Sequence, residues 1–172
     1  PHMDVEPLAD QLSAVKQLLE SDAVPYVDFA VFGAYGLRMA RKLVFVAFAL
    51  APNGEWLRRE LPGPPDFDTW WRSWRVFKTT LLLLEAVATE RLDNYGEFIR
   101  DLDVRYGAEC WFLIYQADCR LRLEHFERIR RRLETQHAAV IASGQISSFR
   151  AAAPWDSVCQ VAIQEKDFWG RE

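Results

Sequence analysis

The sequence is poor in the residues that metal and acid–base chemistry use most. It has three histidines, and one of them belongs to Pro1-His2-Met3, which resembles a protease-tag remnant. It has three cysteines, Cys110, Cys119 and Cys159, with no CxxC pair, and this odd number favours free thiols in a reducing compartment. Glycine motifs that bind phosphate or present a nucleophilic serine are also missing. We therefore predict no catalytic residue, no metal site and no cofactor.

Long hydrophobic runs and an excess of positive charge are missing as well. The longest uncharged apolar run, residues 43–51, is too short to span a bilayer, which needs about 20 residues. The net charge of −4 disfavours a general polyanion binder, because such proteins are basic overall. We expect an intracellular protein, cytoplasmic or nuclear, with no membrane partner.

Neither glycine nor proline occurs between Gly107 and Gly144. Residues 108–143 are therefore predicted to form one very long helix, about 54 Å at 1.5 Å per residue. An apolar stripe follows its length, and its first turns are apolar on every side. We expect the first part to be buried and the distal part to project, to kink or to meet a partner.

Five further segments complete a mainly α fold of five to six helices with one β-hairpin. Helical spacing covers residues 7–21, 29–41, 66–89, 90–106 and the stretch from Pro154. Residues 43–61 predict the hairpin, because Asn53-Gly54 separates two extended runs. The first of these runs is apolar on both faces, so we expect both faces to be covered. After the tag remnant (1–3), we predict a helical domain (4–143), a hinge or loop (144–153) and a C-terminal helix (154–172) that packs on the domain or on a partner.

Two arginines lie inside the apolar stripe of the long helix. An arginine on an apolar face must extend its guanidinium to solvent or find an anion. Asp118 precedes Arg122 by four residues and Glu134 follows Arg130 by four, so pairing within the helix is one interpretation. The other is an anion or a partner's carboxylate. The predicted interaction surface comprises Arg122, Arg130, Leu133, His137, Val140, Ile141, Trp155, Phe168 and Trp169.

A second set of residues indicates nucleic-acid contact. The densest positive segment is residues 128–132, and residues 70–78 interleave aromatic side chains with cations, as base stacking and phosphate contact require. However, Trp70, Trp74 and Phe77 share one helix face, which favours core packing. The candidate contacts are Arg41, Lys42, Arg72, Arg75, Arg128, Arg131 and Arg132.

Four strings of the sequence together resemble a known class of proteins. They are VPYVDFAVFGAYGLRMARK, GPPDF…W…W.VFK, YG..CW.LIYQAD.R.R.EH.ERIRR and PWD…FW..E. They resemble Gag-like open reading frames that accompany retroelement-like repeats in some protist genomes, over residues 24–170. The resemblance implies a capsid-like helical domain upstream of a nucleic-acid-binding region, and it implies no catalytic residue. The zinc knuckle expected in that downstream region is absent from this sequence.

These observations lead to three hypotheses of function. The first is a non-enzymatic, self-associating scaffold or interaction domain, capsid-like and from a mobile element, whose partner is a second copy or another protein. The second is a nucleic-acid-associated helical module that uses the arginine-rich long helix. The third is a small enzyme of unrecognised class, which requires a polar pocket around His137 or Cys119.

Overall fold

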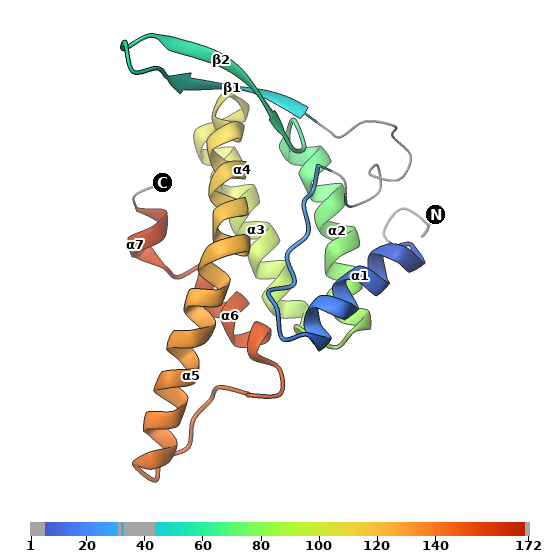
Figure 1. The fold of residues 1–172 in the computed structure, drawn as a ribbon, viewed down its shortest axis with the longest axis vertical. Helices are drawn as coiled ribbons and strands as arrows, with labels where there is room; N and C mark the ends of the chain where they lie inside the picture. The colour runs from blue at the N-terminus through green and yellow to red at the C-terminus, as the bar shows by residue number, and fades with distance from the viewer. Residues whose placement is uncertain (1–5, 31, 33–43, 171–172) are drawn as a thin grey trace.

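A computed structural model describes residues 6–30, 32 and 44–170, and over these residues the protein is mainly helical (Figure 1). The predicted fold class is confirmed, including one hairpin and one very long helix. The predicted helix 29–41 lies almost wholly outside the described residues. The elements are α1 (Ala9–Glu20), β1 (Val44–Leu50), β2 (Trp56–Pro62), α2 (Phe67–Leu83), α3 (Thr89–Tyr106), η1 (Ala108–Cys110), α4 (Trp111–Arg120), η2 (Leu121–His125), α5 (Phe126–Ala142), α6 (Pro154–Ala162) and α7 (Lys166–Trp169).

The aromatic side chains of α2 form the centre of the core. Asp66 caps α2, because its carboxylate accepts a hydrogen bond from the Thr69 amide at 2.8 Å. Trp70 and Trp74 are buried with their rings stacked 5.3 Å apart, and Tyr95 of α3 stacks on Trp74. Trp70 and Trp74 therefore pack in the core, as their spacing indicates.

The long helix consists of η1, α4, η2 and α5 joined end to end over residues 108–142. Helix α4 packs against α3, and α5 continues beyond the bundle (Figure 1). A π-helical turn at Leu121–His125 interrupts the α-helix, and the hydrophobic pattern did not predict it. Such turns are rare and widen the helix locally. Residues 108–142 thus span about 50 Å.

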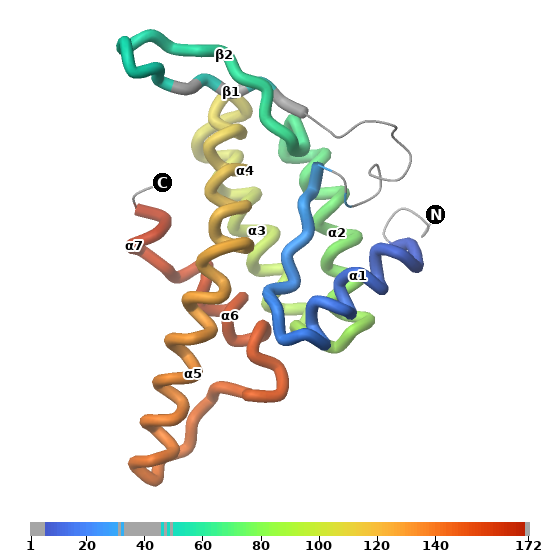
Figure 2. The backbone as a smooth tube through the Cα atoms, viewed as in Figure 1, coloured from blue at the N-terminus to red at the C-terminus, as the bar shows by residue number. Residues whose placement is uncertain are grey.

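The segment after α1 and the C-terminal helix α6 both lie close to the long helix. The segment after α1 runs between α2 and α4, as the tube in Figure 2 shows. The predicted C-terminal helix is two helices, α6 and α7, and α6 packs on α3 and α5. The helix is broken after Ala162 because the chain turns back there. The turn brings Trp169 of α7 against the end of α6, and its indole N–H donates to the Ala162 carbonyl at 2.9 Å. Residues 145–153, before α6, form neither helix nor strand, and Phe149 is buried within this segment.

Candidate interaction surface

The hairpin is built around a short turn between β1 and β2. The Gly54 amide donates to the Ala51 carbonyl at 2.9 Å, and the Ala51 amide donates to the Glu55 carbonyl at 2.8 Å. Gly54 has a φ of +84°, which L-residues rarely adopt, and the Asn53 side chain accepts from the Glu55 amide. The Asn-Gly signal therefore predicted the position of the turn correctly.

One face of the hairpin is apolar and open to solvent. Residues directly opposite each other in an antiparallel pair point to the same face. The register pairs Leu50 with Trp56, Phe48 with Arg58, and Val46 with Glu60. We call these six side chains the hairpin face, and all six are exposed. The exposed fractions are 54% for Phe48, 62% for Leu50 and 70% for Trp56, so the face exposes large apolar side chains side by side.

The expectation that both faces of the hairpin are covered is wrong. The hairpin crosses the N-terminal end of α4, and its turn extends past the bundle (Figure 1). On the side opposite the hairpin face, Leu61 near the base packs against the core, whereas Leu57 nearer the turn is 53% exposed. Along β2, the bundle thus supports the hairpin at its base and not near its turn.

The predicted interaction residue Arg122 is buried in the core instead. Its Nε and Nη2 donate to the Asp118 carboxylate at 2.9 and 2.7 Å, and Nη1 donates to the Val27 carbonyl at 3.3 Å. Asp118 also accepts from the Trp70 indole at 3.0 Å and from the Tyr95 hydroxyl at 2.6 Å. Burial opposes the charge of Arg122, but the Asp118 carboxylate outweighs it and raises the pKa of the guanidinium. Arg122 therefore forms the ion pair within the helix that its four-residue spacing from Asp118 allowed.

Arg130 also binds within the protein. Its Nη1 donates to the carboxylate of Asp22 at 2.7 Å and to the Asp22 carbonyl at 3.1 Å, and its Nη2 donates to Glu127 at 2.7 Å. The guanidinium lies 5.0 Å from the centre of the Trp155 ring. Asp22, just after the end of α1, has a φ of +58°, so Arg130 holds a turn of unusual conformation against α5 and α6.

The other predicted interaction residues divide between core and surface. Trp155 and Phe168 are buried in the protein's own core, so their assignment to an exposed surface is wrong. Leu133 and Trp169 pack partly buried against that core, and the ring of His137 lies 5.4 Å from that of Phe149. Val140 is half-buried, and Ile141 is exposed. These residues do not form one exposed patch, because the return of the chain through Phe149 and α6 covers most of the apolar stripe.

The candidate nucleic-acid contacts lie on separate elements. Arg72 and Arg75 are exposed on α2, which lies apart from α5 in Figure 1, and residues 41 and 42 (Arg41, Lys42) lie outside the described residues. On α5, Arg131 pairs with Glu127 at 3.2 Å and Arg132 pairs with Glu165, while Arg128 is exposed. Two of the three α5 candidates thus already bind carboxylates of this chain.

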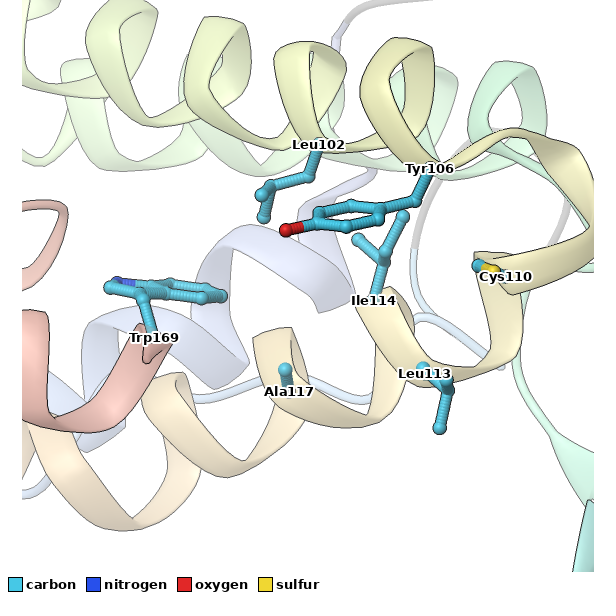
Figure 3. Close-up of a pocket in the computed structure, with 7 residues that line it drawn as sticks. All are labelled: Leu102, Tyr106, Cys110, Leu113, Ile114, Ala117 and Trp169. Carbon is cyan, nitrogen blue, oxygen red and sulfur yellow. The ribbon is translucent and has the colours of Figure 1, made fainter. Parts of the chain in front are cut away.

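Three cavities adjoin the long helix, and two of them include a cysteine. A cavity of about 200 Å³ between α3, α4 and α7 is mostly apolar, and in Figure 3 Tyr106 and Ile114 point into it. A second cavity of about 300 Å³ is lined by Tyr26, Asp28, Tyr115 and Cys119, among others. Burial raises the pKa of the Cys119 thiol, so the thiolate that nucleophilic chemistry needs is disfavoured. Within the described part of the chain, no cluster of three metal-binding side chains occurs.

Comparison with protein-family models, with curated proteins and with solved structures finds no match to this chain. Over residues 6–30, 32 and 44–170, no helix has both the length and the apolar character needed to cross a bilayer. Among the described residues, the hairpin face is the best candidate functional surface, because its large apolar side chains are exposed side by side.

Proposed function

We propose that this protein is a non-enzymatic, self-associating scaffold domain that makes contact through its hairpin. The observation that carries the proposal is the hairpin face, with Phe48, Leu50 and Trp56 all more than half exposed. Burying apolar surface contributes about 25 cal/mol per Å², and contiguous exposed apolar patches on soluble proteins mark interaction sites. Aromatic anchors such as Trp also contribute most of the binding energy in many interfaces.

The contacts inside the core also favour a non-enzymatic function. The residues that could have served catalysis or anion binding are engaged in packing: Arg122 and Asp118 bind each other, and the Cys119 thiol has a raised pKa. The bundle provides a rigid base, and the hairpin extends from it. The finer assignment to a capsid-like particle of a mobile element rests on the sequence resemblance, and self-association is the property that such a particle requires.

The test is a concentration series measured by light scattering and sedimentation velocity. We expect the wild-type mass to rise with concentration and the double variant F48S/W56S to remain monomeric. The matched control is Ile146→Ser, because Ile146 is a single apolar side chain, 98% exposed, in the loop before α6. This control should associate like the wild type. A wild-type protein that stays monomeric at every concentration, or an F48S/W56S variant that associates normally, would overturn the proposal.

A further inference from the structure

The charges on the hairpin face identify the partner more closely. Only Arg58 and Glu60 are charged among its six side chains, and they lie on the same face of the same strand, two residues apart. The face therefore has no net charge, with one positive and one negative group beside an apolar area formed by Val46, Phe48, Leu50 and Trp56. An anionic membrane or a nucleic acid would be matched by a cationic face instead.

A surface of this kind is complementary to itself. In a two-fold symmetric contact the same patch faces its own copy, so each group meets a group of the other subunit reciprocally. Turning the face by two-fold rotation can place Arg58 of each copy beside Glu60 of the other. Such a contact has two ion pairs beside the buried apolar side chains, and no like charges need to meet.

We infer that the occupant of the hairpin face is a second copy of this chain, packed face to face about a two-fold axis with reciprocal Arg58–Glu60 pairs. This inference rests on the proposed function and specifies its partner and geometry. Stable interfaces bury about 800 Å² on each partner, usually with about 20–30 residues a side. The hairpin face has six residues, so the dimer should be weak and strongly dependent on concentration.

The decisive experiment uses charge reversal in two single variants and their mixture. In R58E, the introduced carboxylate of each copy would meet Glu60 of the other, and in E60R two guanidinium groups would meet in the same way. Each variant alone should dimerise at least about tenfold more weakly than the wild type, because like charges are brought together. An equimolar mixture should regain near wild-type association, since one chain then carries two acidic groups and the other two basic groups. The double variant R58E/E60R should also associate like the wild type.

Arg59→Glu is the matched control. Arg59 lies opposite Ala47 in the register and therefore points to the other face of the same strand. This substitution changes the net charge as much as R58E does, but it should leave dimerisation unchanged. Circular dichroism of every variant checks that the helical bundle is retained.

The outcomes separate the geometry from the proposed function. If F48S/W56S abolishes association but R58E, E60R and their mixture all behave like the wild type, the hairpin is the contact and the reciprocal geometry is wrong. A wild-type protein that remains monomeric refutes both. Cosedimentation of the monomer with phosphatidylcholine–phosphatidylserine vesicles, lost in F48S/W56S, would replace the second copy with a lipid surface and would overturn the inference.

Discussion

At the scale of single residues, Asp118 is the polar centre of the core. Its spacing from Arg122 made the ion pair predictable, because residues four apart share a helix face. The indole of Trp70 and the hydroxyl of Tyr95 also donate to this carboxylate. These partners are distant in the sequence and come from α2 and α3, so spacing along one helix could not identify them.

Asp118→Ala should destabilise the protein by about 3–5 kcal/mol. The substitution leaves the charge of Arg122 buried without its carboxylate, and breaking a buried pair on one side has this cost. Urea unfolding followed by circular dichroism measures the change. The control is Glu97→Ala, which removes the partner of the exposed pair with Arg100 and should cost less than about 1 kcal/mol. Equal losses in the two variants would show that the Asp118 cluster contributes no more than a surface pair.

Cys159 should react with alkylating agents only when the protein unfolds. Burial, with a smaller contribution from Asp156, raises the pKa of this thiol to about 12. Because the folded-state pKa lies above the unfolded value, this thiol favours folding at lower pH, and that contribution is lost as the pH rises from about 9 to 12. Mass spectrometry after iodoacetamide treatment at about pH 8, below the ordinary thiol pKa, measures the labelling at each cysteine. Rapid labelling of Cys159 without denaturant would contradict the raised pKa.

At the scale of elements, helices and turn were predictable because their signals are local. The stripe of α2, the Asn-Gly turn and the stretch without glycine or proline each depend on neighbours in the sequence. The open face of the hairpin was not predictable, because it depends on where the first turn of α4 lies in space relative to the hairpin. The sequence also could not show whether Trp155 and Phe168 pack in this chain's own core or against a partner. An apolar stripe predicts that a helix face is covered, but not by which surface.

The close approach of α2 and α3 at Gly96 leads to a prediction at this scale. A Cβ atom at Gly96 would lie 2.8 Å from Cζ3 of Trp71 and 2.9 Å from Nε1 of Trp74. Gly96→Ala should therefore destabilise the protein by about 1–3 kcal/mol, although alanine is the better helix former. Asn94→Ala, at an exposed position of the same helix, is the control and should be neutral or slightly stabilising. Thermal unfolding measures the stability of both variants. A Gly96→Ala variant as stable as the wild type would show that α2 and α3 can move apart at this position without loss of stability.

At the scale of the whole molecule, the protein consists of a helical bundle and a hairpin, and the second strand of that hairpin, β2, shares little of the core. Buried side chains from α1 to α7 form one apolar cluster, and from β2 only Leu61 is partly buried against it. The bundle should therefore fold without most of the hairpin, while self-association should require it. One shortening of the hairpin should then remove self-association while the bundle still folds.

Phe45 and Leu61 lie opposite each other in the ladder, so an Asn-Gly turn can replace residues 46–60 and join them directly. The shortened protein should keep the helical circular dichroism of the wild type, and its midpoint of thermal unfolding should change little. Light scattering should show a monomer at concentrations where the wild type associates. The Ile146→Ser protein, with its hairpin intact, is the comparison for association. If the shortened protein unfolds, the hairpin is part of the folding unit. If it folds and still associates, the contact lies elsewhere on the bundle, with the exposed end of α5 around Ile141 the next surface to change.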